Sequence, residues 1–277
     1  MALQLKTVPA ASGSRWIGDA WRLFMRRPLA FMSLAAVVGL LSAVVQIFPP
    51  LSLFAVLIPP LLSLGFMVAG QSALLDGPVH PRQFIEPLRA DPRRRRALIV
   101  LSLGYGASVL LIALVLYLVS GSVVEGAVAT VPAAAGAASA PVEIDLQRPE
   151  VLRVLFTAAV LLVMLSIPYW HAPALVHWGG QGVAQALFSS TLAVWRCRGA
   201  FLVYAVAGGA LAIGALMVVS LAAGLLGSPS LVAVLAVPVA LTMTSVFYLS
   251  VLFSFNDSFG GKAVPPMDDD YTRPDPG

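Results

Sequence analysis

The residues best suited to chemistry lie in one short segment, residues 168–179. This segment holds two of the three histidines of the chain, each beside a tryptophan, together with two prolines. Histidine can bind a metal or carry a proton near neutral pH, so the segment is the first candidate site. The residues that we single out as a possible ligand or interface site are Trp170, His171, Pro173, His177 and Trp178.

The spacing of the two histidines argues against a metal site. His171 and His177 are six residues apart, about 240° around an ideal helix, whereas two ligands on one helix face are usually four apart. Pro173 can kink the helix and change that angle. We interpret the histidines and tryptophans as anchors in the cytoplasmic interface of a membrane, where tryptophan is enriched. The alternative is a ligand site at a helix that the proline breaks.

The sequence contains no recognised motif for other kinds of chemistry. The single cysteine, Cys197, excludes an intramolecular disulfide. We find no metalloprotease motif, nucleotide-binding glycine loop or protease residue pair. We therefore predict no catalytic, cofactor-binding or metal-binding residues, no cofactor, and a protein that is not an enzyme and has no nucleic-acid partner.

The composition indicates a membrane protein. Of the 277 residues, 59% are hydrophobic and 11% are charged, whereas soluble domains have roughly 25% charged residues. Apolar runs of the length that crosses a bilayer, ~20 residues, recur along the chain. We predict an all-α bundle of six transmembrane helices, at residues 29–48, 51–75, 97–119, 151–178, 199–226 and 231–255.

The predicted spans lack a carboxylate, lysine or arginine at bilayer depth. Ion-coupled transporters usually place a carboxylate or a basic group at bilayer depth. We expect residues 120–150, rich in small residues and proline, to form a flexible exterior loop, and residues 256–277 a disordered cytoplasmic tail.

Two amphipathic segments complete the predicted architecture. Residues 14–27 place Trp16, Trp21 and Phe24 on one helix face and arginines on the other, which predicts a helix lying in the membrane interface within a cytoplasmic segment, residues 1–28. A milder amphipathic segment spans residues 181–198. Each leads through a basic end into a hairpin, and the sequence leaves open whether the two hairpins are copies.

The distribution of arginine and lysine predicts the orientation. All of them except Arg148 and Arg153 fall on one side of the predicted spans, which is therefore cytoplasmic together with both termini. We expect some of these arginines to face anionic lipid headgroups. They are Arg22, Arg26, Arg93, Arg94, Arg95 and Arg96.

Two stretches carry a resemblance to a known family. They are residues 16–31 and the run from Ala172-Pro173-Ala174-Leu175-Val176 through Ala186-Leu187-Phe188-Ser189-Ser190 to Arg196-Cys197-Arg198-Gly199-Ala200-Phe201. The chain resembles an uncharacterised family of integral membrane proteins of beta-proteobacteria over about residues 14–255. It has Cys197-Arg198 where the family often has asparagine after the basic residue. The resemblance implies a bacterial inner-membrane location and adds no catalytic residue.

Two functions remain open from the sequence. The first is a non-enzymatic membrane component that serves as a scaffold, an assembly factor or a lipid-associated protein, with lipid, other membrane proteins or a second copy as partners. The second is a transporter of a small molecule or lipid that uses the proline-broken fourth helix.

Overall fold

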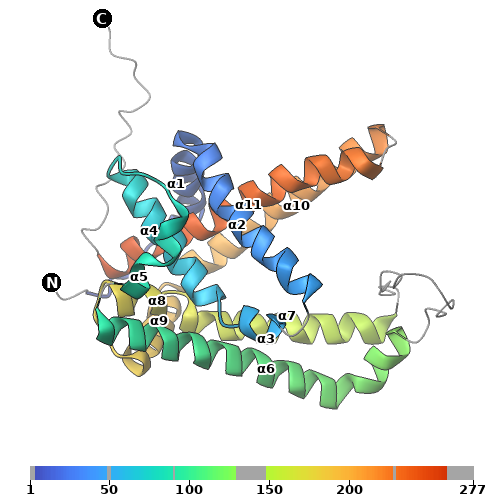
Figure 1. Cartoon of the computed structure of the whole chain (residues 1–277), viewed down its shortest axis with the longest axis horizontal. Helices are drawn as coiled ribbons and strands as arrows, with labels where there is room; N and C mark the ends of the chain where they lie inside the picture. The colour runs from blue at the N-terminus through green and yellow to red at the C-terminus, as the bar shows by residue number, and fades with distance from the viewer. Residues whose placement is uncertain (1–3, 49–50, 90, 129–147, 227–228, 261–277) are drawn as a thin grey trace, which may run out of the picture.

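The computed structural model describes residues 4–48, 51–89, 91–128, 148–226 and 229–260, and the regular elements in these ranges are all helical. This agrees with the all-α prediction. In chain order they are α1 (Ser12–Arg26), α2 (Pro28–Ile47), α3 (Ser52–Ala55), α4 (Pro59–Leu74), η2 (Pro81–Phe84), α5 (Glu86–Arg89), α6 (Pro92–Val128), α7 (Pro149–Tyr169), α8 (Ala172–His177), α9 (Val183–Arg196), α10 (Arg198–Leu226) and α11 (Pro229–Phe259) (Figure 1).

Five helical stretches in the described part of the chain are long and apolar enough to cross a membrane. They are Pro28–Val45, Pro92–Gly121, Pro149–His177, Arg198–Ala222 and Val234–Phe259. The predicted second span, residues 51–75, is not one helix. It consists of α3 and the 16-residue α4, and Pro59 and Pro60 begin α4. Proline suits the first helical turn because the amide hydrogen that it lacks has no partner there.

The predicted fourth span, residues 151–178, is also interrupted. α7 ends at Tyr169, and α8 begins at Ala172 with Pro173 in its first turn. Pro168 is the second-last residue of α7, whereas Pro238 lies well inside α11 without ending that helix. The bounds of α2, α10 and α11 match the predicted first, fifth and sixth spans closely.

Two predicted irregular segments are partly helical. Residues 120–128 continue α6, because no proline occurs before Pro132. Residues 256–259 continue α11, and Phe259 is buried in the core. The remainder of the predicted exterior loop and tail, residues 129–147 and 261–277, lies outside the described residues.

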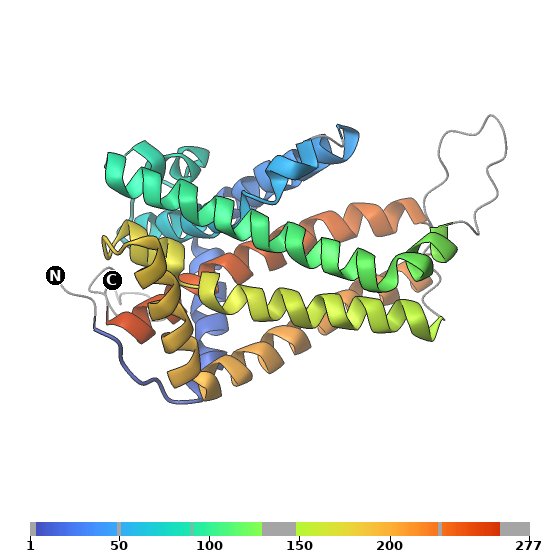
Figure 2. The same ribbon diagram turned by 90° about the horizontal axis from the view of Figure 1, so that it is seen from below.

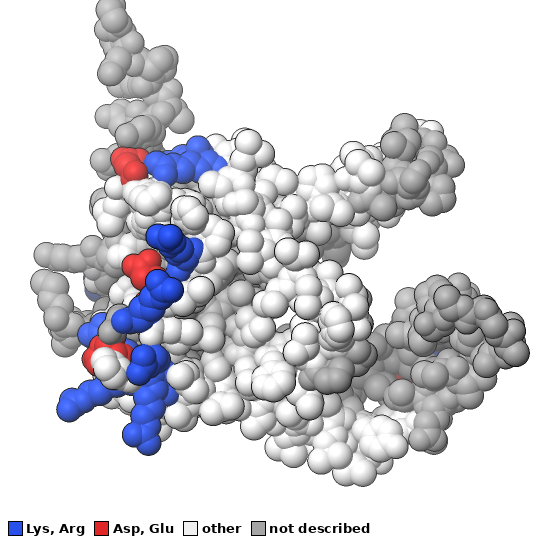
Figure 3. Space-filling model, in the orientation of Figure 1, with Lys and Arg blue, Asp and Glu red and all other residues white. Residues whose placement is uncertain are grey.

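Helices α1 and α9 lie across the long helices (Figure 2). In that view both run at a steep angle to α6, α7, α10 and α11, near the end of the molecule where α6 and α10 begin and α7 and α11 finish. Lysine and arginine gather at the same end on the face shown in Figure 3, while the rest of that face is uncharged where it is described. The two crosswise helices have different neighbours: α1 packs on α10 and α11, and α9 packs on α7 and α8. The two crosswise helices therefore do not repeat each other's contacts.

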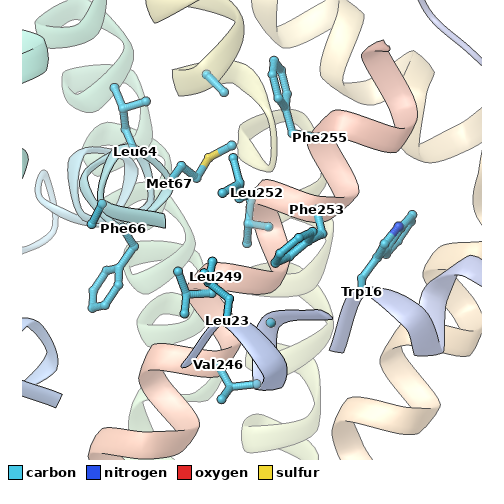
Figure 4. Close-up of a cluster of buried hydrophobic side chains, with 14 of the residues drawn as sticks. Trp16, Leu23, Leu64, Phe66, Met67, Val246, Leu249, Leu252, Phe253 and Phe255 are labelled. Carbon is cyan, nitrogen blue, oxygen red and sulfur yellow. The ribbon is translucent and has the colours of Figure 1, made fainter. Parts of the chain in front are cut away.

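The apolar core forms where α1, α4 and α11 meet. Gly70 of α4 lets these helices approach, because a methyl group on it would meet Leu249 and Leu252 of α11 at 2.8 and 2.9 Å and Leu23 of α1 at 3.6 Å. Figure 4 shows Leu23, Leu249 and Leu252 pointing into this junction. Although α4 is shorter than the five long apolar stretches, it therefore lies at the centre of the fold.

The apolar face of α1 packs on protein. Trp16 is 1% exposed, and its indole lies 5.2 Å from Phe201 of α10, centroid to centroid. The expectation that Trp16 lies among lipid headgroups is wrong, because α10 and α11 cover that face of the helix. Trp21, at 41% exposed, remains accessible. In α9 the pattern is reversed, with small residues inward and the large Phe188 and Trp195 exposed.

Candidate functional site

His171 lies at the break between α7 and α8 and is completely buried. Its Nε2 atom is 3.1 Å from the hydroxyl oxygen of Ser254 on α11, and its Nδ1 atom has no hydrogen-bond partner among the described residues. Three phenylalanines surround the imidazole with ring centroids 5.5 to 5.9 Å away, namely Phe201, Phe255 and Phe259. The interpretation of His171 as an interfacial anchor is therefore wrong, because protein encloses the side chain.

Ser190 of α9 bridges the break in the helix. Its hydroxyl group accepts a hydrogen bond from the backbone N–H of His171 at 3.0 Å and donates one to the carbonyl of Ile167 at 3.0 Å. In an uninterrupted helix the N–H of His171 would bond to the carbonyl of Ile167 directly. A buried hydroxyl thus stands inside the helical hydrogen-bond ladder, which is a recognised cause of a sharp break.

The other residues of the candidate segment contact different parts of the protein. Pro173 is buried in the first turn of α8. The backbone carbonyl of His177 accepts a hydrogen bond from the Arg94 guanidinium at 2.8 Å, and Trp178 packs on Phe255 with ring centroids 5.4 Å apart. No group of three or more His, Cys, Asp and Glu side chains that could hold a metal occurs in the described part of the chain. The two histidines therefore do not form one site.

Trp170, one of the predicted site residues, borders a cavity. This cavity has a volume of about 150 Å³ and lies where the two interrupted helices meet. Pro59 and Pro60, at the start of α4, line one side, and Tyr169 and Trp170, at the end of α7, line another. Both breaks thus border the same cavity, which is open on the side of the exposed Phe247.

Aromatic rings form most of the remaining wall of this cavity. They are Tyr105, Tyr169, Trp170, Phe247 and Tyr248. Neighbouring rings stand nearly perpendicular, with interplanar angles of 76° for Tyr105 and Tyr169 and 87° for Trp170 and Phe247. Edge-to-face contacts of this kind pack the neighbouring rings against one another along the wall of the cavity.

Sequence reasoning missed most of these residues. Tyr105 has the sequence signature of an ordinary packing residue, and Phe247 and Tyr248 lie in a predominantly apolar run that carries only small hydroxyl residues beside them. The sequence did contain one signal, the prolines Pro59-Pro60 and Pro173. They lie in the first turns of α4 and α8, where the predicted second and fourth spans resume after a break. The contact between the two breaks is a tertiary relationship that helical periodicity does not encode.

Some of the predicted lipid-facing arginines are exposed, and others contact protein groups. Arg93, Arg95 and Arg96 are exposed in the first turn of α6, whose start is capped by the Asp91 carboxylate 2.9 Å from the backbone nitrogen of Arg93. Arg94 instead ties α6 to α8 through the His177 carbonyl. In α1, Arg22 lies 3.1 Å from the Asp19 carboxylate.

The helical composition and the five apolar stretches make this chain an integral membrane protein with several transmembrane helices. It is similar to a protein of Burkholderia thailandensis that is named as a probable inner membrane protein. The two are 27% identical over 260 residues, which cover 93% of this chain and 94% of the relative. This similarity supports an inner-membrane location. No family model matches the chain and no solved structure does, so the narrower family resemblance stays a prediction.

Proposed function

We propose that the protein is a non-enzymatic component of the inner membrane that associates with anionic lipid at its basic end. The observation that carries this proposal is the orientation of α9. It lies across the bundle with Ala186, Ser190 and Ala193 buried against protein. Phe188 and Trp195 point outward and are 69% and 68% exposed.

The charges beside α9 suit an anionic surface. The Arg198 guanidinium lies 5.9 Å from the centroid of the Trp195 ring, and Arg196 is exposed at the end of the helix. Exposed aromatic rings next to arginines are typical of helices at the level of lipid headgroups. Each such arginine contributes about 1 kcal/mol of attraction near an anionic membrane.

A sixth crossing is part of this proposal. The backbone nitrogen of Lys6 donates a hydrogen bond to the carbonyl of Ser258 at 2.8 Å, so the two ends of the described chain lie together. A chain that begins and ends on one side of a membrane crosses it an even number of times. We therefore assign the sixth crossing to α3 and α4, and the excess of arginine at this end supports cytoplasmic termini.

Lipid analysis of the purified protein tests the proposed association. The double variant Arg196→Gln/Arg198→Gln should reduce the share of anionic lipid that copurifies in mild detergent, measured by mass spectrometry. Arg153→Gln, on the predicted exterior side, is the matched control and should leave the lipid share unchanged. An unchanged share in the double variant would contradict the lipid association.

A second candidate function is the passage of a small molecule through the bundle. The cavity that both interrupted helices line favours it, because transporters often bind substrate near the bilayer midplane between discontinuous helices. Uptake of a metabolite panel into proteoliposomes tests this function. The variant Ser63→Trp, which fills the cavity, should abolish any uptake that the wild type shows. Uptake that persists in this variant would remove the cavity from the route.

A further inference from the structure

The residues that line the aromatic cavity favour a positively charged ligand over a negatively charged one. Its described lining contains five aromatic rings, two serines, two prolines and a valine, and neither acidic nor basic side chains. The face of an aromatic ring carries partial negative charge and attracts cations. The same faces disfavour an anion, for which this lining offers no positive partner.

Hydrogen bonds or ring contacts hold three of the rings that line the cavity. The indole nitrogen of Trp170 donates to the Ser254 hydroxyl oxygen at 3.3 Å, and Tyr169 is hydrogen-bonded to Ser108. Tyr248 stacks on Phe66 with centroids 4.9 Å apart and an interplanar angle of 9°. Phe247, at 47% exposed, is the most accessible of the five rings and forms the outer edge. The cavity walls are thus held before any ligand arrives.

The size and depth of the cavity restrict the ligand further. A cavity of roughly 150 Å³ in another protein holds benzene, and tetramethylammonium is of comparable size. Tyr105 lies nine residues beyond Arg96 on α6, which is about 14 Å along the helix. That depth is about half of a ~30 Å hydrocarbon core. Only a weakly hydrated cation can give up its water there, so Na⁺ and K⁺ are poor candidates.

We propose that this cavity binds a small quaternary ammonium group, such as tetramethylammonium or the trimethylammonium end of choline. The rings of Tyr105, Tyr169 and Trp170 surround the methyl groups, and Phe247 closes the outer edge. Such a ligand is also the class of molecule that would pass through the bundle under the second candidate function. Binding is measured separately from passage. Choline that binds and does not cross a proteoliposome membrane would support the site and contradict passage.

The test compares two ligands of the same shape. Choline binding to the purified full chain is measured by scintillation proximity with radiolabelled choline, in competition with unlabelled 3,3-dimethylbutan-1-ol, in which carbon replaces the charged nitrogen. We expect saturable choline binding and little competition by the neutral alcohol. Equal competition by the alcohol, or no saturable binding to folded protein, would overturn the proposal.

Substitutions on α6 localise the binding. Tyr105→Leu removes one ring and should weaken choline binding about tenfold, whereas Tyr105→Phe keeps the ring and should bind like the wild type. Tyr117→Leu makes the same change at a residue that is 57% exposed and outside the cavity, and it should have no effect. If Tyr105→Leu does not fold, Phe247→Leu at the accessible edge replaces it. Equal binding by the folded Leu variant and the wild type would place the site elsewhere.

Discussion

The indole nitrogen of Trp16 in α1 donates a hydrogen bond to a carboxylate oxygen of Asp257 in α11 at 2.8 Å, across 241 residues of chain. The indole ring also packs against Phe201 and Tyr204 of α10, with centroids 5.2 and 6.0 Å away. One side chain near the N-terminus thus joins both helices of the last hairpin. This contact explains why one face of an amphipathic helix with two tryptophans is enclosed by protein.

Replacing Trp16 by phenylalanine should destabilise the protein by about 1–3 kcal/mol, because the hydrogen bond to a charged group is lost and the smaller ring leaves a void. Thermal unfolding in detergent, followed by fluorescence or by loss of the monodisperse peak, measures the change. Trp21→Phe is the control on the same helix, where the side chain is 41% exposed. Equal destabilisation by both substitutions would contradict the packing described for Trp16.

The close approach of α1 and α10 depends on Gly13. A methyl group on Gly13 would collide with the backbone carbonyl of Ala200 and with the backbone nitrogen of Tyr204, whereas one on Gly18 would meet nothing within 4 Å. We expect Gly13→Ala to lower the unfolding temperature by several degrees. Gly18→Ala should have no effect or raise it slightly, since alanine favours a helix. A stable Gly13→Ala variant would contradict this interface.

The helix face that carries Trp16 could be predicted from sequence, whereas its partner could not. Helical periodicity shows which side chains share a face, and the basic residues show which end of the bundle they occupy. The apolar interior of a bundle and the apolar region of a bilayer attract the same side chains, so periodicity does not distinguish protein contact from lipid contact. Trp16 and Trp195 illustrate the two outcomes, at 1% and 68% exposed.

Removal of the Ser190 hydroxyl should weaken the joint between α7 and α8. Ser190→Ala leaves the N–H of His171 and the carbonyl of Ile167 without their shared partner in a buried site, which costs about 1–3 kcal/mol. Ser189→Ala on the same helix is the control, because Ser189 is less buried. Stability to increasing SDS, monitored by circular dichroism, reports the difference. If both variants unfold at the same SDS concentration, the two hydrogen bonds of Ser190 contribute nothing to stability.

The break that Ser190 bridges also shows why the spans were only partly predictable. Pro168 and Pro238 lie inside helices, whereas Pro59 and Pro173 begin new ones. The sequence around each proline does not decide between these outcomes. The decision depends on whether a distant group, such as the Ser190 hydroxyl, can satisfy the backbone atoms that the break releases.

The buried environment of His171 predicts that this residue binds no metal. Protein purified in detergent without added metal should contain less than stoichiometric zinc, iron, copper and manganese by mass spectrometry. The variant His171→Ala/His177→Ala should show the same metal content. Stoichiometric metal in the wild type that is lost in the variant would contradict a structural role for the histidines.

Reporter fusions test the orientation that the arginines predict. Alkaline phosphatase, which is active only outside the cytoplasm, should be inactive when fused after Arg96 and active when fused after Ala135. Green fluorescent protein should give the opposite pattern. Phosphatase activity at the first site would reverse the topology, while activity after residue 75 would place α4 with its end outside and contradict the sixth crossing.

The docking of α1 on the last hairpin sets an order of events during synthesis. A ribosome makes α1 first, and α10 and α11, which cover the apolar face of α1, emerge almost 200 residues later. Until then Trp16 lacks its partners in α10 and α11, and the lipid surface can shield it from water. The strong amphipathic character of α1 therefore suits a helix that binds the membrane surface during synthesis and packs against α10 and α11 once they have been made.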